Sequence, residues 1–290
     1  MYLNSQQALE FARCLSYALP SIAAIKDRLV VVKYGGNAMT DESLKIEFAR
    51  DAAVLQALGV QLIIVHGGGP QIGEELKRLG KIPKFVCGMR VTDKVSVDAV
   101  DRILGVEVNQ EIVELINSQG GRAFGINGRD GLVTAKKLYI DESGSKVDLG
   151  YVGDVSFIDE VSIKLALSAA DIPVIAPLGR GIDKVIYNVN ADLVASSVAQ
   201  TIKADLLVLL TNTQGLLDLN GNLIRCLAAN SVEELVETGV IHGGMLPKIK
   251  SALDAVANGV GRVKIADGRT PKCLIIEVLT KLGTGTTVVA

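Results

Sequence analysis

A lysine followed by a glycine pair is the first feature of this sequence suited to chemistry on an anion. Lys33 ends an apolar run, and Gly35 and Gly36 follow it. Glycines let backbone N–H groups approach an anion closely, and a lysine beside them adds positive charge. The spacing predicts an anion-binding turn. An ordinary turn beside a solvated lysine has the same sequence, so both interpretations stay open.

A second turn of the same kind follows the next apolar run. His66-Gly-Gly-Gly-Pro70 leads into a helix that should end near Leu79. Backbone donors and the helix dipole favour anions at such a helix N-terminus. The chain lacks the GxxxxGK[ST] pattern, and Gly67, Gly69 and Gly73 miss the GxGxxG spacing by one residue. The two turns together predict an anion cradle of a different type.

Four further polar residues each have a functional and a structural interpretation. Arg90 could clamp a carboxylate with two hydrogen bonds or lie on the surface. Asn188 could donate to a substrate carboxylate and Asp192 could hold lysine side chains in place. The same two residues could form only an Asx turn and an N-terminal helix charge. Lys248 could be solvated or point at phosphate.

A nucleophile with its base is missing from the sequence. There is no GxSxG motif, and neither His66 nor His242 has a carboxylate at a telling spacing. A phosphoryl transfer to a carboxylate needs no general base, because a carboxylic acid is already ionised at neutral pH. Such an enzyme needs positioning and positive charge.

The chemistry-bearing residues are expected on the turns of an α/β fold. Short apolar runs predict buried strands, and 3.6-residue periodicity predicts helices between them. Their order predicts a parallel sheet with helices on both faces. Between 84 and 151, glycines predict hairpins over the C-terminal edge of the sheet, where a lid or acceptor pocket belongs. The expected strands are 29–32, 60–65, 173–176, 206–210, 263–266 and 286–290, and the expected helices are 41–58, 93–116, 159–170, 191–202, 231–238 and 271–280.

Composition narrows the class of protein. The chain has 290 residues, of which 49% are apolar and 4% aromatic, so its core must be aliphatic. The net charge of -2, without a basic tract, argues against nucleic acid as a partner. Four scattered cysteines and two histidines argue against zinc and disulfides and fit a reducing compartment. We expect a cytoplasmic protein that acts on small molecules, or an organellar precursor after trimming.

Residues 1–27 precede the first strand and should form a helix of their own. Pro20 lies inside the helical pattern and should kink or break it. Glu10 and Arg13 interrupt any signal-peptide core, and no uninterrupted apolar run is long enough to span a membrane. The apolar stripe, which needs a partner surface on its own domain or on another subunit, comprises Phe11, Leu15, Ala18, Leu19 and Ile22.

Five motifs occur together in a defined order: Lys33-Tyr-Gly-Gly36, Val65-His-Gly-Gly-Gly-Pro70, Gly88-Met-Arg-Val-Thr-Asp93, Asn188-Val-Asn-Ala-Asp192 and Gly243-Gly-Met-Leu-Pro-Lys248. From about residue 10 to the C-terminus, this set resembles the amino acid kinase family. It most resembles the members that use ATP to phosphorylate the γ-carboxylate of N-acetyl-L-glutamate, the second step of arginine biosynthesis. The alternatives are another carboxylate, carbamate or UMP as acceptor, or a non-catalytic regulatory member.

The resemblance implies a three-layer αβα sandwich with a mainly parallel open sheet, and a role for each motif residue. Lys33 and Lys248 would neutralise charge on the transferring phosphoryl group, and Asp192 would orient both lysines. Arg90 and Asn188 would hold N-acetylglutamate. Magnesium would be carried by the ATP phosphates without dedicated protein ligands. Residues that bind nucleotide or phosphate would be Gly35, Gly36, Gly67, Gly68 and Thr211, and Gly68 would also face the acceptor.

The resemblance also implies three segments. Residues 1–27 would be a kinked helix that joins dimers into a hexamer, a trimer of dimers. Residues 28–180 would bind the acceptor and residues 181–290 the nucleotide, on one continuous sheet.

The same resemblance implies an arginine effector near the C-terminus, at Lys264, Glu277, Gly283 and Gly285. The sequence departs from the family pattern there, because Lys264 stands where a histidine is common. A further departure is Thr211-Asn212, which replaces a usual Ser/Thr-Asp. The lysine at 264 would affect control by arginine, and Asn212 would affect the affinity for ATP.

Overall fold

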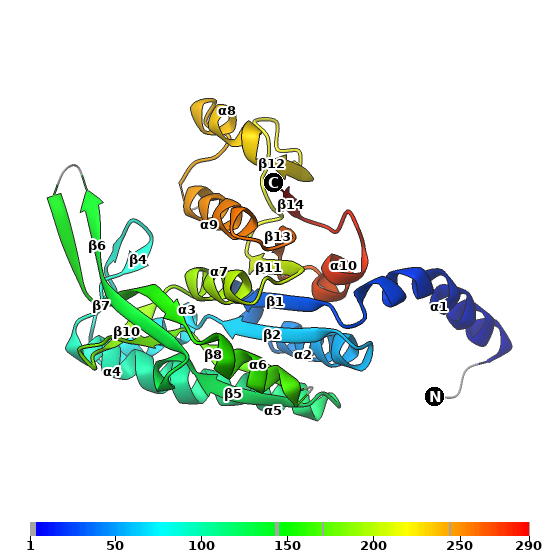
Figure 1. Ribbon diagram of the computed structural model, residues 1–290, viewed down its shortest axis with the longest axis horizontal. Helices are drawn as coiled ribbons and strands as arrows, with labels where there is room; N and C mark the ends of the chain where they lie inside the picture. The colour runs from blue at the N-terminus through cyan, green and yellow to red at the C-terminus, as the bar shows by residue number, and fades with distance from the viewer. Residues whose placement is uncertain (1–3, 143–144, 170, 244, 290) are drawn as a thin grey trace.

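An eight-stranded sheet forms the centre of the protein (Figure 1), with strand order β12-β14-β13-β11-β1-β2-β8-β5. The computed structural model describes residues 4–142, 145–169, 171–243 and 245–289. From β13 to β5 neighbouring strands are parallel, whereas β14 runs antiparallel to β13. The predicted mainly parallel open sheet is confirmed. The strands are β1 (Leu29–Tyr34), β2 (Gln61–His66), β5 (Ala123–Asn127), β8 (Ile172–Ala176), β11 (Leu206–Thr211), β12 (Cys226–Ala228), β13 (Val263–Asp267) and β14 (Thr286–Val289).

Successive residues of β1 point into two separate cores, which is why helices cover both faces of the sheet. Val30 and Val32 belong to one buried cluster, and Val31 belongs to the other. The first cluster lies beneath α2 (Glu42–Ala57), α3 (Gly69–Arg78), α5 (Asn109–Ser118) and α10 (Cys273–Leu279). The second lies beneath α6 (Glu160–Ser168), α7 (Ala191–Thr201) and α9 (Met245–Ala257). These layers make the expected αβα sandwich.

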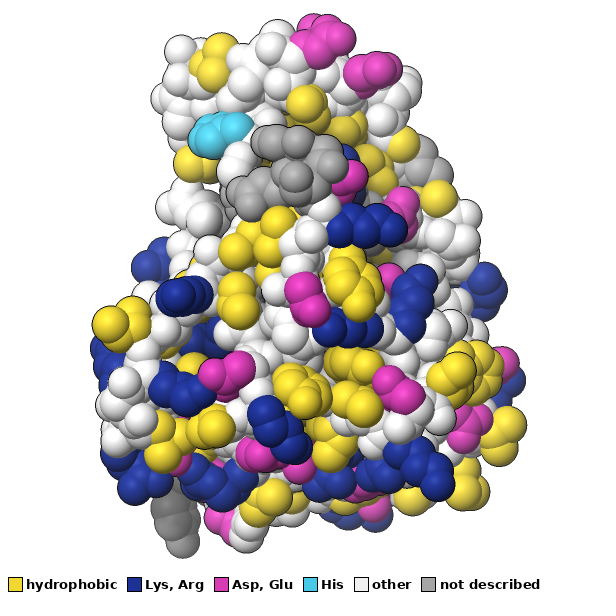
Figure 2. Space-filling view, turned by 90° about the vertical axis from the view of Figure 1, so that its left-hand side faces the viewer, with side chains coloured by type: hydrophobic (Ala, Val, Ile, Leu, Met, Phe, Trp, Pro, Cys, Tyr) yellow, Lys and Arg dark blue, Asp and Glu magenta, His cyan; other side chains and the backbone are white. Residues whose placement is uncertain are grey.

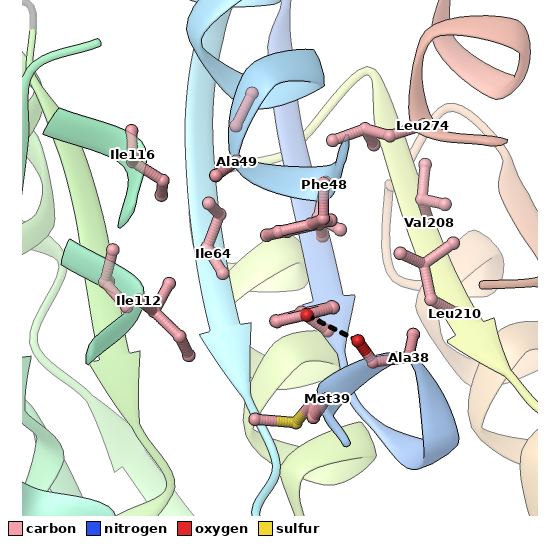
Figure 3. Packing of buried hydrophobic residues seen from close by; sticks show 14 of the residues in the cluster. Ala38, Met39, Phe48, Ala49, Ile64, Ile112, Ile116, Val208, Leu210 and Leu274 are labelled. Atoms are coloured by element: carbon pink, nitrogen blue, oxygen red, sulfur yellow. Dashed lines mark hydrogen bonds between the residues drawn. The ribbon is translucent and has the colours of Figure 1, made fainter. Parts of the chain in front are cut away.

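Figure 3 shows the first core, where Phe48 of α2 lies between the sheet and neighbouring helices. The ring of Tyr34, at the end of β1, stacks on Phe48 with the centroids 3.7 Å apart. Its hydroxyl donates to the carbonyl oxygen of Ala38 at 2.8 Å. Ala38 lies in the short helix η1 (Gly36–Met39), so this contact ties the turn after β1 to the core.

The long helix predicted from residue 93 is present, with an unpredicted π-helical turn in its middle. It comprises α4 (Lys94–Arg102), the π-helical η2 (Ile103–Val108) and α5. Asp93 caps its start, because its Oδ1 accepts the N–H of Ser96 at 2.8 Å. Leu104 of η2 lies against Gly68, where a Cβ would collide with it.

The predicted hairpins lie beside the carboxyl ends of the central strands, at the left of Figure 1. Strands β6 (Val133–Glu142) and β7 (Ser145–Ile158) pair as a long hairpin, and β9 (Leu178–Arg180) and β10 (Ile186–Val189) close a small barrel with them. Strand β10 follows residue 180 but pairs with β7 and β9. The barrel therefore continues past residue 180, and the predicted division into 28–180 and 181–290 stays a prediction.

A second, shorter hairpin stands beside the same edge. Strands β3 (Phe85–Val86) and β4 (Met89–Arg90) are joined by Cys87 and Gly88, both with positive φ, as a two-residue hairpin turn requires. The remaining described elements are η3 (Gly128–Asp130), η4 (Ala229–Ser231) and α8 (Val232–Glu237). Ala170, Gly244 and Ala290, which belong to predicted elements or motifs, lie outside the described residues.

Helix α1 (Ser5–Ile25) projects away from the body of the protein (Figure 1) and continues through Pro20, so the predicted break does not occur. Within the described helix only Ile25 is buried, while Phe11, Leu15 and Leu19 are at least half exposed. By length and composition α1 could cross a membrane. A signal sequence near the N-terminus satisfies the same criteria.

Candidate active site

Lys33, Asp192 and Lys248, called here the Asp192 triad, come from three different elements and meet at the carboxyl edge of the sheet. Lys33 Nζ lies 3.1 Å from Asp192 Oδ1. Lys248 Nζ donates to Asp192 Oδ2. The lysines belong to β1 and to the first turn of α9, and the aspartate to the first turn of α7. The structure therefore brings together all three residues that the sequence singled out as catalytic.

The charges of the two lysines keep Asp192 ionised. Burial by itself would raise the pKa of this carboxyl group, but Lys33 and Lys248 outweigh burial and lower the pKa to about 2. Two cations and one anion leave the triad with a net positive charge at neutral pH. Positive charge held in place in this way suits the binding of phosphate oxygens.

The motif at 188–192 forms the predicted cap, and its Asp192 pairs with two lysines. The contact of Asn188 with a substrate carboxylate stays a prediction. Asn190 caps α7, because its Oδ1 accepts the N–H of Asp192 at 2.7 Å. This is the structural role that the sequence suggested for the motif. The cap also fixes the backbone of Asp192, so the same turn positions the carboxylate between the two lysines.

The Gly35–Gly36 turn fits closely against its neighbours. A Cβ on Gly35 would lie 2.8 Å from Lys33 Nζ, and one on Gly36, where φ is +77°, would collide with Asn212. Asn212 Oδ1 accepts the N–H of Asn37 at 2.8 Å, and its Nδ2 donates to Asn37 Oδ1 at 3.3 Å. Asn212 thus fastens this turn to the end of β11, a contact that the sequence did not predict.

The second glycine turn corrects one prediction. The N–H of Gly67 donates to the carbonyl oxygen of Tyr34 at 2.7 Å, so the backbone of β1 already uses this predicted phosphate donor. Gly68 precedes α3 as its N-cap residue, and its missing Cβ makes room for Leu104. The close approach of a helix, in addition to any ligand, requires glycine at this position.

His66 supports this turn as a neutral side chain. Burial lowers its pKa to about 4, against the opposing effect of the Gly67 carbonyl. Nδ1 must donate to the Gly67 oxygen, 2.7 Å away, because a carbonyl can only accept. Nε2 then accepts from Asn109 Nδ2 at 3.2 Å. Asn109 in turn occupies the space left by Gly125, the reason for a glycine inside the unpredicted strand β5.

A cavity of about 310 Å³ opens beside the triad, and all three predicted acceptor-binding residues, Gly68, Arg90 and Asn188, line it. Lys33 and Asp192 also line it. Asn188 Nδ2 donates weakly to Thr92 Oγ1 at 3.4 Å. Figure 2 views the molecule from this side, where Lys and Arg side chains mix with Asp and Glu. The apolar part of the lining includes Ile72, Met89, Leu104 and Val152.

Arg90 has a free hydrogen-bonding nitrogen in this cavity. Its Nη2 donates to the Gly69 carbonyl at 3.1 Å, and its guanidinium lies 4.7 Å from the centroid of the Phe85 ring. Nη1 is buried without a hydrogen-bond partner, and burial lowers the pKa of Arg90. An unpaired buried donor costs free energy, which an anionic ligand would recover.

Three residues predicted for catalysis or phosphate binding, Gly35, Thr211 and Lys248, do not line this cavity. Thr211 is buried at the end of β11, and its Oγ1 accepts the N–H of Thr213 at 2.9 Å, which shapes the following turn. Lys248 reaches the site through Asp192 alone. Among the described residues, no group of three His, Cys, Asp or Glu side chains could hold a metal ion.

Comparisons with known proteins match this geometry to one family. The amino acid kinase family profile matches residues 28–267. The acetylglutamate kinases of Chromobacterium violaceum and Nitrosomonas eutropha are 49% and 50% identical over 281 residues, which cover 96% of this chain and 97% and 95% of theirs. The chain belongs to the amino acid kinase family, and within it to the acetylglutamate kinases.

A solved structure supports the fold independently. The N-acetylglutamate synthase of Neisseria gonorrhoeae, in complex with coenzyme A and N-acetyl-glutamate, superposes with a TM-score of 0.86 at 25% identity. The match covers 97% of this acetylglutamate kinase chain but 63% of the synthase, so the chain spans under two thirds of that protein.

Three of the four residues predicted to bind arginine, Lys264, Glu277 and Gly283, lie against one another, and Gly285 lies against the Ile265 carbonyl. Lys264 is fully buried, and its Nζ donates to the carbonyl oxygens of Glu277 and Thr280 at 2.8 and 2.9 Å. It also lies 3.3 Å from Glu277 Oε2. We call Lys264 and Glu277 the Lys264 pair. Side chains at Gly283 and Gly285 would collide with Glu277 and with the Ile265 carbonyl.

Proposed function

We propose that this chain transfers the γ-phosphoryl group of ATP to the γ-carboxylate of N-acetyl-L-glutamate, the second step of arginine biosynthesis. The observation that carries the proposal is the Asp192 triad, which is positively charged and borders a cavity with an unpaired Arg90 donor. Near 50% identity to acetylglutamate kinases over almost the whole chain supports this acceptor over carbamate, UMP or another carboxylate.

The transfer requires no proton. A carboxylate oxygen of the acceptor forms a bond to the γ-phosphorus, and the bond from that phosphorus to the bridging oxygen breaks. ADP leaves with the bonding electron pair, and the acceptor becomes an acyl phosphate. The carboxylate is ionised at neutral pH, which agrees with a site whose histidine is buried and neutral.

Lys33 and Lys248 would act on the charge of the transferring group. Phosphoryl transfer spreads negative charge over three equatorial oxygens, and fixed cations stabilise that charge. Asp192 would hold both ammonium groups in place, since its two oxygens each pair with one of them. The three side chains would therefore position charge instead of moving protons.

The acceptor would lie in the cavity with its α-carboxylate on Arg90 Nη1 and Asn188. A guanidinium nitrogen and an amide can bind the two oxygens of one carboxylate. The apolar side chains of Ile72, Leu104 and Val152 fit the acetyl and methylene groups. This arrangement would direct the γ-carboxylate toward Lys33.

The nucleotide would lie across the half of the sheet formed by β11 and β13, within residues 181–290, and Thr211 would shape the adjoining turn. Backbone donors of Gly35 and Gly36 would meet its phosphates. Gly68 would contribute from the α3 side. The second substrate would be the magnesium complex of ATP, with the ion held by the phosphates, because both oxygens of Asp192 are paired with lysines.

A hydroxamate assay tests the proposal directly. The wild-type protein with ATP and N-acetylglutamate should form a hydroxamate, and carbamate, UMP or glutamate in its place should give little or no release of ADP. Turnover that disappears in Lys248→Ala would exclude a non-catalytic member of the family. Lack of acyl phosphate from N-acetylglutamate would disprove the proposed function.

We also propose that α1 joins dimers into a hexamer in the cytoplasm. The support is its exposed apolar stripe, in which Phe11, Leu15 and Leu19 are at least half exposed. Deletion of residues 1–25 should give a smaller particle by light scattering that still turns over. An unchanged mass would contradict the role of this helix.

Arginine remains a proposed effector of the C-terminal cluster. The ammonium of Lys264 occupies the acceptors that a bound guanidinium would use, so arginine would have to open the Lys264 pair. Activity measured with and without arginine tests this. Lys264→His, which restores the common family residue, should respond more strongly than the wild type.

A further inference from the structure

Helices α7 and α9 pack side by side and carry two members of the Asp192 triad in their first turns. Both helices contribute small apolar side chains to the second buried core. The small residues are Ala195, Ala199, Ala252 and Ala255.

One polar contact interrupts this apolar surface. The hydroxyl groups of Ser196 and Ser251 are 2.7 Å apart, and both residues are buried. Ser196 follows Asp192 by four residues, and Ser251 follows Lys248 by three. Residues three and four apart lie on one face of a helix, so the hydroxyl pair lies directly behind the Asp192–Lys248 contact.

We infer that the Ser196–Ser251 hydroxyl pair fixes the register of α7 against α9 and thereby positions Lys248 on Asp192. A slide of one residue changes the axial offset by about 1.5 Å, which would break a hydrogen bond of this length. Both serines are positioning residues, because neither lines the cavity. The inference rests on the proposed function, in which Lys248 faces the phosphoryl group.

Three variants test the pair: Ser196→Ala, Ser251→Ala and the double variant. Each should lower kcat by about tenfold, because a misplacement of about 1 Å can cost up to a hundredfold in rate. The KM for N-acetylglutamate should stay unchanged, since Arg90 and Asn188 are not affected. Ser197→Ala is the matched control, because it changes a neighbouring, half-buried serine of the same helix, and it should keep wild-type kcat.

Stability separates positioning from simple packing. Each single variant leaves one buried hydroxyl unpaired and should lower Tm, whereas the double variant leaves none and should recover most of the Tm. The kcat of the double variant should nevertheless stay low. A double variant in which Tm and kcat both return to wild-type values would overturn the inference.

A failure of the proposed function can be distinguished from a failure of this inference. Wild-type protein without turnover would contradict the proposed function but would leave the inference about the two serines intact. Hydrogen exchange of residues 245–254 does not need turnover, and the double variant should exchange faster there than both the wild type and Ser197→Ala. Equal exchange in all three proteins would end the inference.

Discussion

The Asp192 triad and the Lys264 pair both join lysines to a carboxylate, yet they differ in solvent exposure and in the charge that is left unbalanced. In the triad, the side chains of Lys33 and Lys248 are 13% and 24% exposed, and the cluster has an excess cation. In the Lys264 pair, both side chains are 1% exposed, and the single ammonium meets a carboxylate and two carbonyl oxygens. The triad keeps spare positive charge beside a cavity, whereas the ammonium of the Lys264 pair is engaged by partners inside the protein.

Removing a lysine from the triad should have the largest effect on catalysis. Lys248→Ala and Lys33→Ala are each expected to lower kcat by about a hundred- to a thousandfold, because each removes a fixed cation from the developing charge. Lys33→Ala should change kcat much more than the KM for ATP. Steady-state kinetics with unchanged circular dichroism would establish this, and a loss confined to KM would contradict it.

Removing the lysine of the other cluster should act on stability. Lys264→Met leaves Glu277 buried without its cation and should lower the free energy of unfolding by about 3–5 kcal/mol. Specific activity of the folded fraction should stay near that of the wild type at low temperature. Urea denaturation measures the first quantity. A Lys264→Met protein of normal stability would show that the pair is not structural.

Substitution of a glycine beside each cluster should show the same distinction, with an effect on activity at the triad and an effect on stability at the Lys264 pair. Gly36→Ala places a Cβ against Asn212 at positive φ, and Gly283→Ala places one against Glu277, also at positive φ. We expect Gly36→Ala to lower kcat/KM for ATP by about tenfold, since the turn must shift from the phosphates. Gly283→Ala should cost about 1–3 kcal/mol of stability with normal kinetics. A loss of stability alone in Gly36→Ala, together with a loss of kcat/KM alone in Gly283→Ala, would refute the comparison.

The smallest expected effect is a pH dependence of stability from Asp192. Its pKa is about 2 in the folded protein, whereas an unfolded aspartate has a pKa of about 4. Ionised Asp192 therefore stabilises the fold fully above about pH 4, and this contribution is lost as the pH falls toward 2. The difference in unfolding free energy between the wild type and Asp192→Asn should shrink over that interval. A difference independent of pH would argue against the lowered pKa.

Local patterns in the sequence predicted most of the sheet, because strands depend on short-range signals, whereas the triad was predicted from the resemblance of five motifs to a family. The strand runs at Leu29 and Leu206 are continuous and β-branched or leucine-rich, and the Asp192 motif stands at a helix start. Strand β5 escaped prediction because Gly125 interrupts it, and that glycine is explained only by Asn109, sixteen residues earlier in the chain.

Long-range contacts explain the other differences. Nothing near Gly67 indicates that its N–H is already used by Tyr34, and nothing near Asn212 reveals its hydrogen bonds to Asn37, 175 residues away. The Ser196–Ser251 contact likewise joins helices 55 residues apart. Sequence patterns predict elements, whereas pairings between elements require the assembled fold.

The π-helical turn η2 means that the helix from Lys94 to Ser118 holds surplus chain in its middle. Each residue of an α-helix advances the side chains by about 100° around the axis. Deletion of one residue within 103–108 would convert this segment to a regular helix and rotate Asp93 and the β3–β4 side of the cavity relative to Asn109 and His66. The number of residues in this one helix thus sets the orientation of the cavity wall relative to the glycine turn at His66.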